Sequence, residues 1–292
     1  MPDQSPNARV TIISVTFNSM AVLPAMLASV PAGAQVVIVD NSTTQAAETA
    51  ALADHHGARL IANPKNLGFG VACNQGAAVA DTEFLLFLNP DATLAPDTLI
   101  ELVAAAERFP RASAMNPRIA EADGSASFKR HSHLMRRAER MARGWPTSDT
   151  EVTVLSGAAL FVRRVDFDAV GGFDPAIFLY HEDDDLSRRL RAERGPIMFV
   201  RGALVQHLAG QSSVRSPEIA ALKAWHMGRS RVYTMRKHAR PAPFLTSVAS
   251  ALAQLASPVL LLSARKRAKQ WAFLRGVLSA RKPSRVGTKT PL

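Results

Sequence analysis

The sequence is short of cysteine and of aromatic residues, and each shortage argues against a class of protein. Cys73 is the only cysteine among 292 residues, so no disulfide can form within the chain. Aromatic residues make up 6% of the chain, and it contains no helix-turn-helix or RNA-recognition pattern, which argues against nucleic acid as a partner. The first nine residues are mainly polar and include proline. They do not read as a secretory signal, and we expect a cytoplasmic protein.

Apolar and basic residues are plentiful. Hydrophobic residues form 47% of the chain, which is enough for one large α/β domain with an appendage. The formal net charge of +11 suits nucleic acid, an anionic membrane surface or a phosphorylated substrate. The placement of the basic residues is therefore more informative than their number.

Short apolar runs alternate with helical segments along the first part of the chain. The predicted strands are residues 10–17, 36–39, 59–62 and 84–88, and the predicted helices are residues 20–30, 46–55, 70–80 and 96–109. Further strands are expected at 152–162, 197–200 and 203–206. This alternation predicts an α/β fold with a mostly parallel central sheet flanked by helices. Ligands are then expected at the carboxyl ends of the strands.

Two segments depart from this alternation. Residues 121–149 have few apolar side chains and carry the basic residues Lys129, Arg130, Arg136, Arg137, Arg140 and Arg143. Residues 241–264 contain no charged residue but have basic residues on both flanks, which favours helices lying at an anionic membrane surface over a single span. A buried helix or a dimer contact is the alternative. We expect a disordered stretch at 1–8, a domain at 9–213 and a helical, membrane-associating region at 214–292.

Four adjacent carboxylates, residues 182–185, lie where an aromatic segment passes into a helix. Leu186 and Leu190 share one face of that helix, and the pairs Asp184/Arg188 and Asp185/Arg189 have the i,i+4 spacing of helical ion pairs. One interpretation is an acidic first turn that suits the helix dipole. The other is a general base, because crowded like charges favour protonation of one carboxylate near neutral pH.

Several polar motifs follow the predicted strands in a fixed order. Asp40 at a strand tip can accept hydrogen bonds from a nucleobase or ribose, with Thr16 and Asn18 closing the pocket, although a simple turn also fits. The Asn- and Gly-rich loop 63–70 precedes a helix, so its backbone N–H groups and Lys65 can face a phosphate, or it is an ordinary helix cap.

The ordered set of motifs resembles the family 2 inverting glycosyltransferases of GT-A fold, in particular their bacterial rhamnosyltransferase-like branch. The resemblance covers about residues 9–213. The matching segments are SVTFN (14–18), VDNS (39–42), NPKNLGFG (63–70) with Asn74, LNPD (88–91), GGFD (171–174) and YHEDDDL (180–186).

The resemblance also implies roles for individual residues. Asp183 is the expected base, with Glu182 orienting the acceptor, and Asp185 is expected to be structural. Asp91 and His207 are the expected ligands of Mg²⁺ or Mn²⁺, with Asn89 replacing the first acid of the family's metal motif; a Pro-Asp turn and a structural histidine are the alternatives. The donor-binding residues are expected to be Thr16, Asn18, Asp40, Lys65, Asn66, Asn74 and Asn89.

The expected function is a metal-dependent, inverting glycosyl transfer in cell-surface polysaccharide biosynthesis. A dTDP- or UDP-sugar, with rhamnose or another hexose, is the expected donor. A glycan or polyprenyl-diphosphate-linked sugar is the expected acceptor, used at the inner face of the cytoplasmic membrane. The alternatives are a basic membrane-surface or nucleic-acid-binding protein without catalysis and a nucleotidyltransferase of similar sheet topology.

Overall fold

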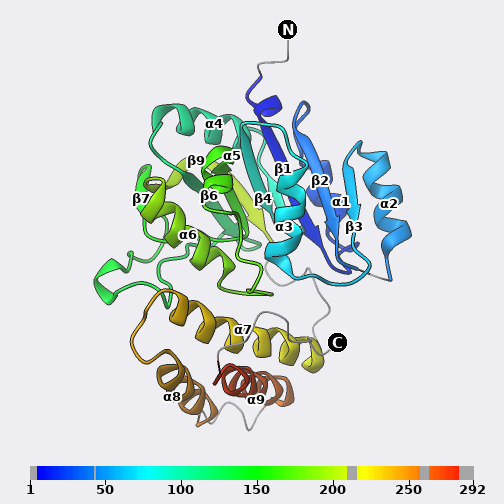
Figure 1. Cartoon of the computed structure of the whole chain (residues 1–292). Coiled ribbons are helices and arrows are strands. Elements are labelled where there is room, and N and C mark those ends of the chain that lie inside the picture. Colours follow the sequence, from blue (N-terminus) through cyan, green and yellow to red (C-terminus); the bar gives the residue numbers. More distant parts are fainter. Residues whose placement is uncertain (1–4, 43, 209–215, 257–262, 283–292) are drawn as a thin grey trace. The chain divides into compact units, whose positions relative to one another are not determined.

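The computed structural model describes residues 5–42, 44–208, 216–256 and 263–282. It divides into two compact units (Figure 1). The first unit comprises residues 1–174 and 183–213, and the second comprises residues 175–182 and 214–292. Part of the stretch expected to be disordered, residues 1–4, lies outside the described residues, and a short 3₁₀ helix, Asn7–Arg9, precedes the first strand.

The first unit is built on one mixed sheet, with strand order β3-β2-β1-β4-β8-β6-β9-β5 and β7 paired to β9. The strands are β1 (Val10–Thr16), β2 (Gln35–Asp40), β3 (Arg59–Ala62), β4 (Phe84–Leu88), β5 (Ala92–Leu94), β6 (Ala114–Glu121), β7 (Thr150–Val152), β8 (Ala159–Arg163) and β9 (Ile197–His207).

The prediction of a mostly parallel sheet holds for only half of it. Strands β3, β2, β1 and β4 are parallel neighbours, as the alternation of strands and helices requires. Strand β8 is antiparallel to both β4 and β6, and β5 and β7 are antiparallel to β9. The expected strands at 197–200 and 203–206 are one continuous strand, β9, which pairs with β6 through a register shift.

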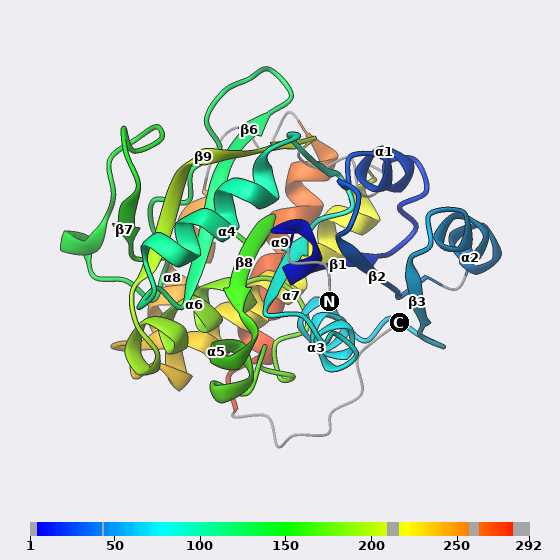
Figure 2. The ribbon, with the colours of Figure 1, turned by 90° about the horizontal axis from the view of Figure 1, so that it is seen from above.

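Helices cover both faces of this sheet (Figures 1 and 2). The helices α1 (Leu23–Ala28), α2 (Ala46–His55) and α4 (Thr98–Arg108) contribute to one apolar cluster. The helices α3 (Phe69–Ala78), α5 (Arg164–Ala169) and α6 (Glu182–Glu193) contribute to the other. The continuous run Phe84–Leu88 is buried because β4 lies between these two layers.

The second unit contains the helices α7 (Pro217–Lys237), α8 (Pro243–Leu255) and α9 (Ala264–Ser279), which share a small apolar core. Helix α8 covers much of the charge-free stretch, of which residues 257–262 lie outside the described residues. Among the described residues, no helix combines the length and apolar composition that crossing a bilayer requires.

Two glycines allow α7 and α9 to pack backbone to backbone. A Cβ atom at Gly276 would clash with the Trp225 carbonyl oxygen, and one at Gly228 would clash with the Phe273 carbonyl oxygen. We therefore expect Gly276→Val to lower the free energy of unfolding of the second unit by about 1–3 kcal/mol through overpacking. Urea unfolding of the full chain with Trp145 replaced by phenylalanine, which leaves Trp225 and Trp271 of the second unit as the fluorescent tryptophans, measures this. Ala264→Val, at an exposed position of α9, is the matched control, and equal stability of the two variants would contradict the helix packing.

Candidate active site

One edge of the sheet collects most of the motifs that were predicted to carry chemistry. The carboxyl ends of β1, β2, β3 and β4 meet there because these strands are parallel neighbours. The antiparallel strand β8 begins at the same edge, where Ala159 pairs with Leu88. The end of β9 is joined to the segment after β4 by the pairing of His207 with Ala92. Thr16, Asp40, the 63–70 loop, Asn89, Asp91 and His207 therefore come from adjoining strand ends.

Asp40 is a buried carboxylate at this edge, and only one of its two oxygens is hydrogen-bonded within the described residues. Its Oδ1 accepts hydrogen bonds from Thr16 Oγ1 at 2.9 Å and from the Ser42 backbone N–H at 2.9 Å. Its Oδ2 is buried and has no hydrogen-bond partner among the described residues, although the residue is only 1% exposed. Buried polar atoms are normally satisfied, so this oxygen has the features of an acceptor reserved for a ligand's N–H or O–H group.

The other residues predicted to bind the donor differ in how they are engaged. Asn18 is exposed, has a left-handed backbone conformation (φ 55°), and accepts a hydrogen bond from Thr44 Oγ1. Lys65 is exposed after the end of β3, so its ammonium is accessible to an anionic ligand. Asn66 accepts a hydrogen bond from the Gly68 backbone N–H at 2.9 Å and thereby shapes the loop before α3.

Asn74 has a structural task in this arrangement. Its side-chain nitrogen donates to the Phe173 carbonyl at 2.8 Å, and its Oδ1 accepts from the Phe173 backbone N–H at 2.9 Å. Both ends of the amide are thus used to fasten the GGFD segment to α3. Asn89 is half-buried, and its backbone N–H donates to the Ala158 carbonyl at 3.0 Å, which links the end of β4 to the segment before β8.

Asp91 and His207 form a buried polar pair. The Nε2 atom of His207 lies 3.3 Å from Asp91 Oδ1, and the two side chains are 15% and 2% exposed. Burial acts to lower the pKa of His207, but Asp91 and Glu121 outweigh it and raise the pKa above its ordinary value. No group of three or more His, Cys, Asp or Glu side chains suited to a metal occurs among the described residues. A carboxylate oxygen and an imidazole nitrogen are both groups that bind divalent cations in proteins, so the pair fits such an ion.

The acidic run begins helix α6, as predicted, and its last member, Asp185, makes a structural contact. Asp185 is fully buried and pairs with Arg189 at 2.8 Å, as the i,i+4 spacing predicted. Arg189 also donates to the carbonyls of Val170 and Gly172, so this pair joins α6 to the GGFD segment. Tyr180 and His181, just before the helix, both have left-handed backbone conformations (φ 66° and 70°), which are uncommon for such side chains.

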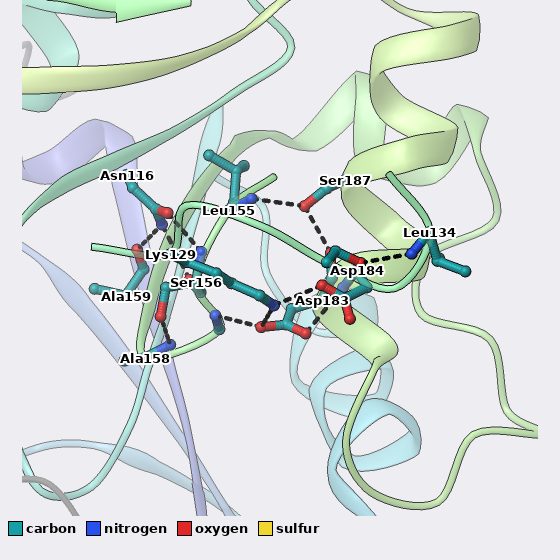
Figure 3. Close-up of polar contacts among 12 residues, drawn as sticks. Asn116, Lys129, Leu134, Leu155, Ser156, Ala158, Ala159, Asp183, Asp184 and Ser187 are labelled. Carbon is teal, nitrogen blue, oxygen red and sulfur yellow. Dashed lines mark hydrogen bonds and ion pairs between the residues drawn. The ribbon is translucent and has the colours of Figure 1, made fainter. Parts of the chain in front are cut away.

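Asp183 and Asp184 share an unforeseen partner, Lys129 (Figure 3). The ammonium lies 2.6 Å from Asp183 Oδ2 and 2.8 Å from Asp184 Oδ1. Burial acts to lower the pKa of Lys129, but the two carboxylates outweigh it and raise the pKa, so the side chain is an ammonium ion. Asp183 Oδ2 also accepts a hydrogen bond from the Gly157 backbone N–H at 2.9 Å. From the sequence, Lys129 was only one of six basic residues in its segment. No spacing pattern connects it to Asp183, which lies 54 positions later in the chain.

Comparison with known proteins gives a consistent picture. Residues 11–171 match the family Glycosyl transferase family 2. The chain is 30% identical to an N-acetylglucosaminyl-diphospho-decaprenol L-rhamnosyltransferase of Mycobacterium tuberculosis, over 89% of this chain and 95% of that one. It is 28% identical to the rhamnosyltransferase WbbL of Escherichia coli K12, over 54% of this chain and 64% of that one.

The fold resembles a solved glycosyltransferase. A mannosyltransferase from Pyrobaculum calidifontis, in complex with GDP-Man and Mn²⁺, matches with a TM-score of 0.57 and 15% identity. The match covers 93% of this chain and 86% of that one.

Proposed function

We propose that this chain, which belongs to glycosyl transferase family 2, transfers rhamnose from dTDP- or UDP-rhamnose to a polyprenyl-diphosphate-linked N-acetylglucosamine with inversion at the anomeric carbon. Similarity to the mycobacterial rhamnosyltransferase along nearly the whole chain carries this proposal. The product would enter a cell-surface polysaccharide. Family membership rules against the alternatives of a nucleotidyltransferase and of a basic binding protein without catalysis.

The donor nucleotide is assigned to the tips of β1 and β2. The unpartnered Oδ2 of Asp40 would accept a hydrogen bond from the base or ribose, with Thr16 holding the carboxylate and Asn18 at the neighbouring strand tip. Lys65, accessible after β3, would face the diphosphate. Asn66 and Asn74 would support the donor site by fixing the loop and the GGFD segment.

Asp91 and His207 are assigned to a divalent cation, Mn²⁺ or Mg²⁺, with Asn89 beside them. A cation bound here supplies positive charge that stabilises the departing diphosphate. The pair is already assembled by the contact of β5 with β9, since the Leu208 backbone N–H donates to the Asp91 carbonyl at 2.8 Å. His207 must be neutral to bind a cation through Nε2. This nitrogen lies 3.3 Å from Asp91 Oδ1, so the two proposed ligand atoms are already close together.

Asp183 is assigned as the general base. It would take the proton from the acceptor hydroxyl as that oxygen attacks the anomeric carbon, and the bond to the diphosphate would break on the opposite side with its electron pair leaving on the diphosphate. Glu182, the adjacent and buried first residue of α6, would orient the acceptor. A single displacement of this kind inverts the configuration and needs no covalent intermediate.

A thermal-shift panel tests the donor assignment. A ligand that binds only the folded protein stabilises it by a free energy of RT ln(1 + [L]/Kd), and its melting temperature rises accordingly. We expect dTDP- or UDP-rhamnose with Mn²⁺ to stabilise the full chain and GDP-sugars to have little effect. Stabilisation by GDP-sugars alone would contradict the proposed nucleotide.

The second unit is proposed to attach the enzyme to the inner face of the cytoplasmic membrane. Helix α8 exposes Leu245 and Leu252, which are 68% and 53% exposed, and α9 exposes Trp271 near basic side chains. Exposed apolar side chains combined with basic residues favour an anionic lipid surface. The lipid-linked acceptor would be presented at the same surface.

Vesicle sedimentation tests this attachment. We expect the full chain to bind vesicles containing anionic phospholipid several-fold more tightly than neutral vesicles, because each basic side chain near the surface contributes about 1 kcal/mol. The double variant Leu245→Ser/Leu252→Ser should lose most of this binding. Ile100→Ser, at an exposed apolar position of α4, is the matched control. Binding by the double variant at the wild-type level would contradict the role of α8.

A further inference from the structure

Lys129 is the one basic side chain of residues 122–149 for which the structure shows contact with the proposed base. It is three-quarters buried, and its two carboxylate partners are 84% and 95% buried. The contacts of Lys129 are thus shielded from solvent, unlike an ordinary surface ion pair. Removing one member of such a pair leaves the other charge buried without its partner, which is unfavourable. We therefore expect the arrangement to have a function.

The residues around Lys129 hold it in place. The preceding residue, Phe128, packs its ring edge to face against Phe199 of β9, with the ring centroids 5.6 Å apart. The following residue, Arg130, accepts a hydrogen bond through its carbonyl from the Met141 backbone N–H at 3.0 Å. The lysine is therefore anchored on both sides by contacts of its neighbours.

The two oxygens of Asp183 are left in different states. Oδ2 accepts from both Lys129 and the Gly157 backbone N–H, which occupies its two lone pairs. Oδ1 accepts only from the Asp184 backbone N–H, at 2.8 Å. One lone pair of Oδ1 is therefore free among the described residues, and Oδ1 is the atom able to accept another proton.

We propose that Lys129 is a positioning residue for the transfer reaction, which fixes Asp183 through Oδ2 and so leaves Oδ1 to accept the proton of the acceptor hydroxyl. This inference rests on the proposed role of Asp183 as base. When the acceptor O–H bond breaks and the Oδ1–H bond forms, Asp183 loses its charge. Asp184 then keeps the ammonium paired, so Lys129 retains a carboxylate partner before and after the transfer.

The charged groups around Asp183 come from two segments of the chain. Residues 122–149 supply Lys129, and α6 supplies Glu182, Asp184 and the Asp185–Arg189 pair. The segment before β8 contributes only the Gly157 backbone N–H. Lys129 is thus the positive charge in contact with Asp183. Replacing Lys129 would leave Asp183 beside the carboxylates of Glu182 and Asp184 without this positive charge.

Steady-state kinetics of Lys129→Met tests the inference, with dTDP-rhamnose, Mn²⁺ and a short-chain polyprenyl diphosphate N-acetylglucosamine as substrates. We expect kcat to fall about 10–100-fold near neutral pH, as for loss of a positioning group, with the KM for the donor within about twofold. Lys129→Arg should restore kcat in part, because it keeps the positive charge next to Asp183.

Three further variants separate the outcomes. Arg111→Met removes an exposed positive charge with no polar side-chain contact in the described structure and should behave as wild type. If Lys129→Met does not fold, Lys129→Gln takes its place, because glutamine also lacks the positive charge but is polar. The same fall in kcat is expected for Lys129→Gln. A kcat equal to that of Arg111→Met would overturn the inference. Normal turnover by Asp183→Asn would instead overturn the proposed function, and the role of Lys129 with it.

Discussion

Replacing Asp183 with asparagine is expected to lower kcat by about 10²–10⁴-fold, the usual contribution of a positioned general base. Asparagine has nearly the same shape and can still accept the hydrogen bond from Gly157, so the site should stay folded. It cannot take the acceptor's proton at neutral pH. Donor affinity, measured by calorimetry with the donor and Mn²⁺, should change by less than about twofold, because the donor is assigned to the strand tips.

Asp168→Asn is the matched control for this experiment. Asp168 is exposed at the end of α5 in the same unit, so its replacement removes one carboxylate without touching the site. It should retain wild-type turnover. If Asp183→Asn transferred sugar as fast as Asp168→Asn, another residue would have to be the base.

Replacing Asp91 with alanine is expected to weaken Mn²⁺-dependent donor binding by about 100-fold. Even residues that only support a metal ligand typically contribute 10–100-fold to metal affinity, and Asp91 is assigned as a direct ligand. The variant should also lose the dependence on Mn²⁺, so that donor binds with similar weak affinity with and without the ion. Calorimetric titration of the donor into each protein, with Mn²⁺ and with a chelator, measures both effects.

Asp97→Ala provides the comparison for Asp91. Asp97 is exposed before α4 and caps no backbone group with its side chain. It should bind donor as the wild type does. Unchanged donor affinity of Asp91→Ala in the presence of Mn²⁺ would contradict the metal assignment.

The first half of the fold was predictable because its signals are local. Buried runs such as Phe84–Leu88 identify strands, and the alternation with helices makes β1 to β4 parallel. The polar residues at the strand ends were placed correctly for the same reason. Parallel neighbours end at one edge, so Asp40 and Asp91 had to come from that side of the sheet.

The second half of the fold was less predictable, because hydrogen bonds to side chains from distant segments interrupt one of its expected strands. Residues 152–162 read as one apolar strand, but the structure has β7 and β8 with a break at 153–158. In that break the backbone N–H groups of Leu155, Ser156 and Gly157 donate to Ser187, Asn116 and Asp183 (Figure 3). These hydrogen bonds replace the pairing with a neighbouring strand, and no local sequence pattern predicts them. They also bring the backbone N–H of Gly157 to the proposed base, Asp183.

The acidic run shows the same division between local and distant information. Helix spacing predicted the Asp185–Arg189 pair, which is present. It also suggested Arg188 for Asp184, but Arg188 donates to the Leu134 carbonyl, and Asp184 pairs with Lys129. Spacing identifies partners one helical turn apart, whereas Lys129 comes from a different segment. Only the tertiary structure could connect it to Asp183.

The anomeric configuration of the product is the most direct test of the proposed reaction. The full chain would be incubated with dTDP-rhamnose, Mn²⁺ and a short-chain polyprenyl diphosphate N-acetylglucosamine, and the disaccharide would be analysed by NMR. A single displacement assisted by Asp183 predicts a glycosidic bond of the opposite anomeric configuration to the donor. A product that retains the donor's configuration would contradict the account.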